Sequence, residues 1–598
     1  MSIMKGIRFL RLLFFRAIRW LSGRISSRNY QILVSIIIGI VAGLVAVVLK
    51  VLVHGVRDWL YGADPTSGRL AFVFLPALGI VLTLVYTRLI LRRPIDSGLS
   101  NLIYAISKKR INIPVHETYS HVISSSLTVG FGGSVGLEAP IVRTGSAIGA
   151  NLARLLGVGR RKQTLFLACG AAAGISAIFN SPVAGVIFAF EVLVTDIAIH
   201  SFIPLLISAA TAAVVAKILY YEKIFFLPAG GWQIKALPFY LLLGVAAGLM
   251  SVYVSRATAW ASELLNKRVQ SFYWRIAVGS AALGLLIFLM PPLFGEGYDT
   301  VNKLLIGQES SLADHSLFYG LAGNPLFIFL FGVFILFGKA IATSVTIAAG
   351  GNGGKFAPTM FTGATLGFVF AYGINQLGWV TLNQANFIAV AMGGLMSGVF
   401  KSPLTGIFLI AEITGGYELF IPLMIVSALS YFVSLYFEPH SALIRDLARK
   451  GLWAPSHERD WHILSNLNVG ALMETNFRVL TTEMTLGAFV EVIAKSKRNV
   501  FPVVDKEGIL KGVILLDDVR ELMFNKEAYE KTTVGDLMHQ PPATVGISDT
   551  MEQVMDKFEN SMAWNLPVLD KANRYLGFVS KSSIFNEYRR SLIDRSKD

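Results

Sequence analysis

The chain has 598 residues, of which 54% are hydrophobic and 15% are charged, and its mean hydropathy is +0.59. This composition excludes an ordinary soluble protein of this size and predicts a chain whose solvent is lipid. The net charge of +15 does not indicate nucleic-acid binding, because basic residues are concentrated before the first apolar segment. They are Lys5, Arg8, Arg11, Arg16, Arg19, Arg24 and Arg28.

Residues 1–29 contain no acidic residue. The positive-inside rule therefore predicts a cytoplasmic N-terminus. Apolar side chains such as Phe9 and Trp20 are interleaved with the basic ones, which is typical of an amphipathic helix on a membrane surface. The segment does not read as a cleavable signal peptide, because the apolar run after it is long enough to span a bilayer. A basic start with a single cysteine, Cys169, fits a bacterial inner membrane, and a eukaryotic membrane stays open as the alternative.

Apolar runs recur from Gln31 to about Tyr436, many of them about 18 or more residues long, which is the length of a membrane-spanning helix. From about His457 onward the charged residues are frequent, and the apolar residues form short strand-like and helix-like patterns. The sequence therefore predicts a membrane half followed by a soluble half.

The membrane half contains an internal repeat. Residues 181–185 read Ser-Pro-Val-Ala-Gly and lead to Glu191, and residues 402–406 read Ser-Pro-Leu-Thr-Gly and lead to Glu412. A second pair at nearly the same offset is Gly-Leu-Glu-Ala-Pro at 136–140 and Gly-Lys-Phe-Ala-Pro at 354–358. A duplicated apolar unit interrupted by Gly and Pro predicts a transporter with broken helices and a substrate site where the repeats meet. We interpret Glu191 and Glu412 as structural groups at helix ends.

Proline directly after a glycine-rich turn predicts a helix start in the middle of an apolar region. Unpaired N–H groups and the helix dipole make such starts attractive to anions, and partial charges allow release as well as binding. The alternative is that the glycines serve only close helix packing. Three segments fit an anion-binding role: 96–100 (Asp-Ser-Gly-Leu-Ser), 132–140 and 350–358.

In this order and spacing, the three segments resemble the anion-binding motifs of the CLC family of chloride channels and chloride/proton exchangers. The resemblance implies that Glu138 is the gating glutamate and proton acceptor. It implies that Ser97 offers its hydroxyl to the central anion. The remaining implied anion-binding positions are Gly98, Gly136, Leu137, Phe356 and Ala357.

The motifs also depart from the family pattern, with Asp96 and Ser100 in place of Gly and Pro, and Leu137 in place of a basic residue. Exchangers of the family usually carry a second glutamate that relays protons, and the matching position here is Val192. Valine carries no proton, which favours channel-like passive conduction over chloride/proton exchange, although some relatives exchange protons without that glutamate. The family's inner-gate tyrosine aligns with either His440 or Leu443.

The soluble half is itself duplicated. Each copy opens with Val-Gly and Leu-Met, continues with a helical stretch and a Pro-Val strand, and ends with a Gly-led strand and a helix. This resembles a tandem pair of CBS domains, which in some proteins bind adenine nucleotides. The ribose-binding acid of such modules matches Asp518 in the first copy and Ser583 in the second. A nucleotide site and a purely structural role both stay open.

Three other classes of protein are weighed against anion transport. A membrane metalloprotease needs two His four residues apart, but His116 and His121 are five apart. Divalent-cation transport needs intramembrane oxygen ligands at suitable spacing, and the sequence does not show such a cluster. A non-conducting sensor with nucleotide-binding CBS modules would tolerate decay of the pore motifs, yet Ser97, Glu138 and Phe356 are all present.

The sequence thus predicts a polytopic α-helical membrane protein of two inverted repeats with broken helices, plus a soluble α/β tandem CBS module. It predicts no enzyme activity, no metal and no required cofactor; chloride is the expected substrate, and the resemblance implies a homodimer with its CBS domains in the cytoplasm. The expected segments are 1–29 (basic amphipathic), 30–438 (transmembrane, with repeats at about 30–221 and 236–438), 439–468 (linker), 469–525 (CBS 1) and 532–592 (CBS 2).

Overall fold

The computed structural model divides the chain into two compact units, Met1–Trp453 and Ala454–Asp598, and each is described by itself. The residues that it describes are 26–61, 68–93, 95, 97–107, 112–193, 201–220, 231–269, 271–378, 380–449, 467–570 and 572–597. The amphipathic helix expected within residues 1–29 lies almost wholly outside the described residues.

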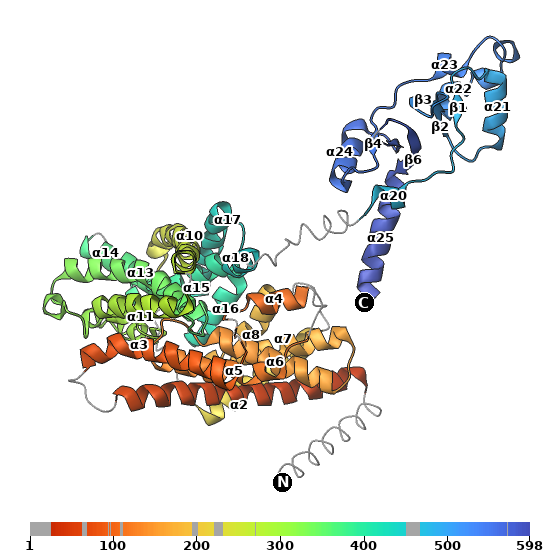
Figure 1. Ribbon diagram of the computed structural model, residues 1–598. Helices are drawn as coiled ribbons and strands as arrows, with labels where there is room; N and C mark the ends of the chain where they lie inside the picture. Colours follow the sequence, from red (N-terminus) through yellow and green to blue (C-terminus); the bar gives the residue numbers. More distant parts are fainter. Residues whose placement is uncertain are drawn as a thin grey trace, which may run out of the picture. The chain divides into compact units, whose positions relative to one another are not determined.

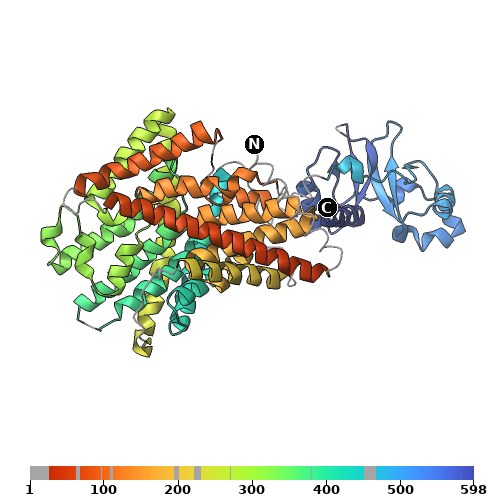
Figure 2. The same cartoon turned by 90° about the horizontal axis from the view of Figure 1, so that it is seen from below.

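The first repeat is built from helices that differ widely in length (Figure 1). They are α2 (Ser27–Tyr61), α3 (Gly68–Val85) with the π-helical turn η1 (Tyr86–Ile90), α4 (Ser100–Ser107), η2 (Val115–Thr118), α5 (Ser120–Gly130), α6 (Glu138–Leu155), α7 (Arg160–Phe179), α8 (Pro182–Phe188) with η3 (Ala189–Leu193), and α9 (Phe202–Leu219). In Figure 2, α2 (red) lies over the orange helices of the same repeat, and it packs against α5, α6, α7 and α9.

The second repeat and the segment that follows it also combine long and short helices. They are η5 (Ile234–Ala236), α10 (Leu237–Arg268), α11 (Phe272–Leu289), η6 (Pro291–Leu293), α12 (Tyr298–Leu305), η7 (Glu309–Ala313), η8 (Tyr319–Leu321), α13 (Pro325–Ala348), α14 (Phe356–Gln376), α15 (Gln384–Phe400), α16 (Pro403–Ile413), α17 (Phe420–Phe437) and α18 (Ala442–Arg449). Helix α18 occupies the start of the segment expected as a linker, and it packs against α4 and α15.

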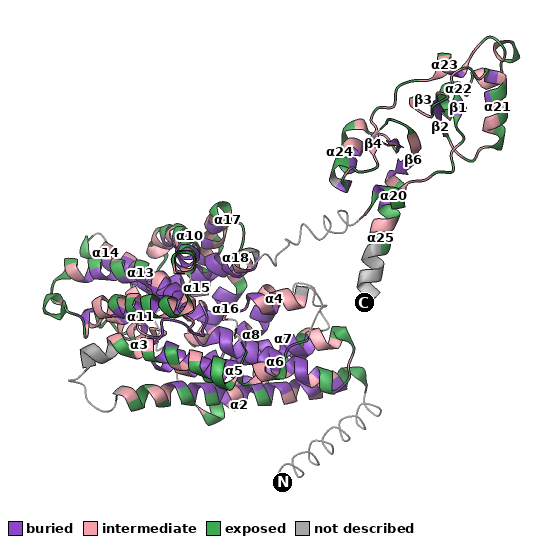
Figure 3. Cartoon of the chain, in the orientation of Figure 1, coloured by how far each residue is buried: buried purple, intermediate pink, exposed green. Residues whose placement is uncertain are grey.

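Within the described ranges, nine helices are long and apolar enough to cross a membrane. Several of the remaining helices are short and mostly apolar, among them Pro182–Leu193 and Pro403–Ile413. These short helices begin inside the bundle, and Figure 3 shows α7, α8, α15 and α16 mostly buried. Backbone that breaks at this depth is stable only when it is enclosed by protein or lines a cavity.

Backbone geometry confirms that the membrane unit is built twice. Helices α7 and α15 both end on a left-handed residue, Asn180 and Lys401, each followed by Ser-Pro. The α6–α7 and α14–α15 pairs pack through equivalent glycines, so that a Cβ on Gly145 would collide with the Gly170 carbonyl oxygen and one on Gly363 would lie 2.7 Å from the Ala391 carbonyl oxygen. Small residues permit this close approach of helix backbones.

The second unit has two three-stranded sheets of the same design. In each, the first strand pairs in parallel with the second, and the second pairs antiparallel with the third. The first sheet contains β1 (Leu480–Thr481), β2 (Val500–Val504) and β3 (Leu510–Leu515), and the second contains β4 (Val545–Gly546), β5 (Asn565–Leu569) and β6 (Tyr575–Ser580). The expected Pro-Val strands are β2 and β5, in which Pro502 pairs with Val513 and Pro567 with Phe578.

Short helices complete both modules of the second unit. They are α20 (Val469–Leu472), α21 (Leu486–Lys495), α22 (Leu516–Val519), η9 (Leu522–Phe524), η10 (Lys526–Ala528), α23 (Val534–Leu537), α24 (Met551–Ser561) and α25 (Lys581–Lys597). Isolated bridges join Val513 to His539 and Glu474 to Phe578, so each module contributes backbone to the other.

Candidate functional site

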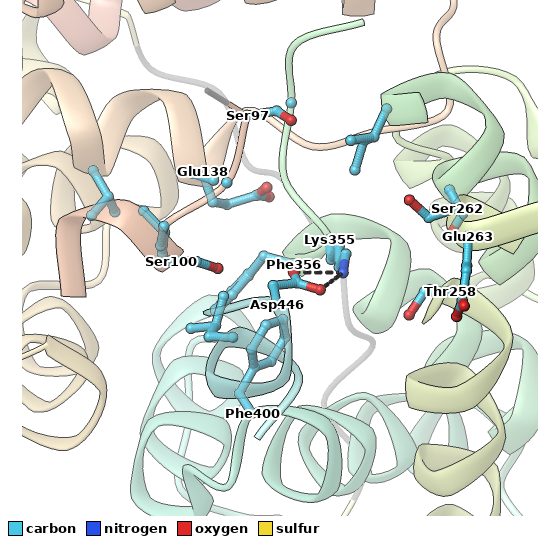
Figure 4. A pocket seen from close by; sticks show the side chains of 18 of the residues that line it. Ser97, Ser100, Glu138, Thr258, Ser262, Glu263, Lys355, Phe356, Phe400 and Asp446 are labelled. Carbon is cyan, nitrogen blue, oxygen red and sulfur yellow. Dashed lines mark hydrogen bonds and ion pairs between the residues drawn. The ribbon is translucent and has the colours of Figure 1, made fainter. Parts of the chain in front are cut away.

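A cavity of about 570 Å³ lies inside the first unit, where elements of both repeats meet (Figure 4). Its wall combines helix starts, hydroxyl groups and aromatic rings. Its lining residues are Ser97, Gly98, Leu99, Ser100, Glu138, Ala139, Val142, Ile175, Phe188, Thr258, Ser262, Glu263, Asn266, Lys267, Ser344, Ile347, Gly353, Lys355, Phe356, Phe400, Leu443 and Asp446. The cavity therefore includes residues from each of the three predicted anion-binding segments.

Two helix N-termini, those of α6 and α14, are joined head to head beside this cavity. Gly136 and Gly354 exchange backbone hydrogen bonds, with N···O distances of 2.9 and 2.8 Å. Glycine is required here because a Cβ on Gly136 would collide with Glu138 Oε2 and lie 2.7 Å from Ala357 Cβ. The positive ends of two helices consequently meet at the interface between the repeats.

The Glu138 carboxylate lies at this junction and is 1% exposed. Its Oε2 accepts a hydrogen bond from the Ala357 N–H at 3.4 Å, and its Oε1 accepts one from the Tyr298 hydroxyl at 2.6 Å. In Figure 4 the side chain points into the pocket, with Ser97 and Phe356 near it. The Glu138 carboxylate of the first repeat thus accepts a hydrogen bond from a backbone N–H at the start of α14, in the second repeat.

The other expected anion-binding residues divide into two groups. Ser97, Gly98 and Phe356 line the cavity with Glu138. Gly136, Leu137 and Ala357 are not among the lining residues, and their N–H groups donate to the Gly354 carbonyl, Glu296 and Glu138 respectively.

The structure separates the two candidates for the inner gate. Leu443, at the start of α18, is buried and lines the cavity, whereas His440 is exposed and is not among the lining residues. Val192, in the position of the relay glutamate, is half-buried in η3 and also does not line the cavity.

Glu191 and Glu412 cap helices of the opposite repeat, as expected of structural groups at helix ends. The Glu412 carboxylate accepts from the N–H groups of Val183 and Ala184 at the start of α8, at 3.1 and 2.9 Å. The Glu191 carboxylate accepts from those of Leu404 and Thr405 at the start of α16, at 3.1 and 2.7 Å.

Three polar contacts near the cavity were not expected from the sequence. Glu296 Oε1 accepts from the Leu137 N–H at 3.1 Å, and the Tyr298 hydroxyl binds Glu138. Lys355, the residue before α14, forms an ion pair with both Asp446 oxygens at 3.0 and 2.8 Å, drawn as dashed lines in Figure 4. The signal for the first two is the sequence Gly-Glu-Gly-Tyr at 295–298, an acid between glycines in an apolar region.

In the second unit, Asp518 is held by local contacts. Its Oδ2 accepts from the Leu515 N–H at 2.8 Å and lies 3.3 Å from His539 Nδ1. The matching residue of the second module, Ser583, donates its hydroxyl to the Ser580 carbonyl and accepts from the Ser580 N–H. Among the described residues of both units, no group of three or more His, Cys, Asp or Glu is placed to hold a metal ion.

Comparison with known proteins supplies the family. The profile of the voltage gated chloride channel family matches residues 78–435, and that of the CBS domain matches residues 469–525 and 534–590. A ClcB-like chloride channel protein of Ralstonia nicotianae is 28% identical over 426 residues, which cover 67% of this chain and 93% of the relative. Chloride channel protein CLC-f of Arabidopsis thaliana is 24% identical over 639 residues, covering 91% of this chain and 80% of the relative.

The fold is that of solved CLC structures. A slow cyanobacterial Cl⁻/H⁺ antiporter superposes with a TM-score of 0.60 at 19% sequence identity, over 71% of this chain and 98% of the antiporter. The family profile covers more than half of the chain, and its members are channels and transporters rather than enzymes. The chain is therefore a multi-pass membrane protein of the CLC family, which transports anions, and it carries a C-terminal pair of CBS domains.

Proposed function

We propose that this protein conducts chloride and similar small anions passively through the cavity described above, and that Glu138 gates the pathway. The observation that carries the proposal is the position of the Glu138 carboxylate, which lines the cavity while it accepts the Ala357 N–H. A carboxylate in that position competes with an anion for the same helix end. Ser97, Gly98 and Phe356 supply the remaining polar and backbone surface for the anion.

Proton binding changes this competition. An ionised Glu138 holds the amide and blocks the anion, whereas a protonated one has no charge to keep it at the helix end. Chloride flux should therefore rise as the pH falls. Leu443 is the proposed inner constriction, because it is an apolar side chain on the cavity wall near the start of α18.

Val192 supports passive conduction over exchange, because a valine cannot relay the proton that an exchanger returns for each transport cycle. Chloride/proton exchange is the alternative, and it needs another inner proton acceptor. Two carboxylates on the cavity wall, Glu263 and Asp446, are available for that role.

The test is chloride efflux from proteoliposomes with a chloride gradient, measured with and without a potassium ionophore while the external pH is followed. For a channel, efflux needs the ionophore and moves no protons, and Glu138→Gln raises efflux at neutral pH and weakens its pH dependence. The control is Glu309→Gln, because Glu309 binds the Gln384 side chain and is not among the cavity-lining residues.

The other outcomes identify the alternatives. Uphill proton movement that is lost in Glu138→Gln would establish an exchanger. Absence of efflux at every pH would favour a non-conducting sensor with nucleotide-binding CBS modules. An unaltered pH profile in Glu138→Gln would contradict the gating role.

The same proposal includes a homodimer in a bacterial inner membrane, with the N-terminus and the CBS pair in the cytoplasm. Asp518 is the candidate ribose contact for an adenine nucleotide, since it lies in α22, the short helix that follows β3. Nucleotide binding would compete with its present contact to His539.

A further inference from the structure

The loop from Leu293 to Tyr298 is fastened to both repeats. Its Gly295 N–H donates to the Gly132 carbonyl of the first repeat at 3.0 Å. The fully buried ammonium of Lys339, on α13 of the second repeat, donates to the carbonyls of Leu293 at 3.2 Å and Gly295 at 2.7 Å. Both repeats therefore hold the loop in place next to the Gly136–Gly354 junction.

Glu296 is placed by the glycines on either side of it. Gly295 and Gly297 have φ values of 57° and 92°, which L side chains rarely adopt. A Cβ on Gly297 would also collide with the ring of Phe361. The conformation directs Glu296 Oε1 to the Leu137 N–H at 3.1 Å.

Two amides at the helix junction are thus occupied by two different carboxylates. Glu138 takes the N–H of Ala357 on α14, and Glu296 takes that of Leu137 at the start of α6. Tyr298, two residues after Glu296, donates its hydroxyl to Glu138 and so links the loop to the first carboxylate. Each carboxylate holds a position at a positive helix end where an anion would be attracted.

We propose that Glu296 is a second gating carboxylate, in series with Glu138, and that it must leave the Leu137 amide before an anion can bind there. This inference rests on the proposed function, in which Glu138 gates the pathway. Proton uptake by Glu296 frees the amide in the same way as for Glu138. Because the cavity wall includes Glu138 but neither Glu296 nor Tyr298, Glu296 controls the step beyond the cavity.

Titratable groups on four elements surround Glu296. They are Glu138 on α6, Tyr298 on α12, Lys339 on α13 and Arg57 on α2. Lys339 supplies a buried positive charge to the same loop, which offsets the cost of placing two carboxylates close together. Arg57 also forms an ion pair with Asp299, which lies in α12 directly after the loop.

The test is chloride flux through the full-length protein in proteoliposomes from about pH 8 to about pH 4, which spans ordinary carboxyl titration. We expect Glu138→Gln to retain a rise in flux of at least roughly twofold toward acid pH, and the double variant with Glu296→Gln to lose it. Glutamine keeps an oxygen that accepts the Leu137 N–H, so the change removes charge with little change in shape. Glu309→Gln removes a carboxylate that binds the Gln384 side chain and is not among the cavity-lining residues, and it is the matched control.

The outcomes separate this inference from the proposed function. If Glu138→Gln alone abolishes all pH dependence, and Glu296→Gln has no effect, then Glu138 gates and the role of Glu296 is overturned. If Glu138→Gln leaves the profile unchanged, both are overturned. A second readout is chloride binding to the purified protein by calorimetry, in which Glu296→Ala should add a chloride site; an unchanged stoichiometry in folded protein would mean that Glu296 is only structural.

Discussion

The two pairs of helix ends in the membrane unit are built on the same symmetry but are completed differently. At α8 and α16 each repeat caps the other with an equivalent glutamate, Glu412 or Glu191, and each carboxylate accepts two N–H groups. At α6 and α14 the equivalent positions hold Glu138 and Phe356, and the joint consists of the Gly136–Gly354 bridge. The repeat symmetry is kept at α8 and α16, where the glutamates cap helix starts, and it is lost at α6 and α14, beside the cavity.

The physical reason lies in what the helix ends must do. Buried N–H groups need permanent acceptors, and a carboxylate from a neighbouring helix supplies them without breaking the repeat symmetry. An anion pathway needs helix ends whose acceptors can leave, so carboxylates that each accept a single amide, as Glu138 and Glu296 do, suit it better than a reciprocal pair. The aromatic residue Phe356 instead packs against Phe179, Phe188 and Phe400.

The largest expected effect comes from removing a cap from the α8 and α16 pair of helix starts. Glu412→Ala leaves the N–H groups of Val183 and Ala184 without their acceptor, and we expect the free energy of unfolding to fall by about 2 kcal/mol. Thermal unfolding in detergent measures this loss.

The matched control for that variant is Glu418→Ala, which removes an exposed acid from the loop after α16. Equal stability of the two variants would mean that the reciprocal caps contribute nothing. In folded Glu412→Ala protein, the pH midpoint of chloride flux should stay that of the wild type, since Glu412 is not among the cavity-lining residues.

A smaller effect is expected at the α6 and α14 pair of helix starts beside the cavity. Lys355 precedes α14, where a positive charge opposes the helix dipole, and Asp446 on α18 neutralises it on the cavity wall. Asp446→Asn should strengthen chloride binding by about 1 kcal/mol, which is roughly fivefold in Kd, and slow chloride release. Calorimetry and flux measure the two changes.

The reversed pair Lys355→Asp with Asp446→Lys should restore most of the wild-type affinity. Weaker chloride binding in Asp446→Asn would contradict the neutralising role and would point to a loss of structure at α18 instead.

The smallest effect is expected for a helix cap that is exposed to water. Asp536 accepts from the hydroxyl and the N–H of Thr533 at the start of α23, at 2.7 and 2.9 Å, and these hydrogen bonds lower the pKa of Asp536 below its ordinary value. A lowered pKa means that the stabilisation is present above the ordinary pKa of 3.8 and is lost as the pH falls through the folded-state pKa.

Hydrogen–deuterium exchange of segment 533–539 in the full-length protein tests this cap. Protection should decrease in acid for the wild type, and Asp536→Asn should be less protected at neutral pH and less sensitive to acid. Identical acid sensitivity in both proteins would show that another group is responsible.

Much of the fold was readable from local sequence. Proline at a helix start after Ser181 and Ser402, glycine-rich turns and the length of the apolar runs each have a local physical cause, so they predicted the broken helices and the repeat. Pro502 and Pro567 lie at equivalent positions of β2 and β5, and the CBS profile matches both copies, which confirms the predicted CBS pair. These features depend on residues close together in the chain.

The contacts that complete the site join residues far apart in the chain. Glu138 and Tyr298 are 160 positions apart, and Leu137 and Glu296 are 159 apart. That Leu443 lines the cavity and His440 does not also depends on how α18 packs, because both residues match the position of the family's inner-gate tyrosine in the sequence. No local pattern specifies which distant carboxylate or hydroxyl reaches a given helix end.

The sequence by itself determined that the chain lies in a membrane, that its membrane half is duplicated and that Glu138 stands at a helix start. Composition, periodicity and turn chemistry act over a few residues, and a single sequence contains them in full. Only the tertiary structure decided that Glu296 and Tyr298 contact residues at the start of α6, beside the Gly136–Gly354 junction. It also decided that Asp446 neutralises Lys355. Such contacts arise when the two repeats pack together, and helix packing sets which side chains meet.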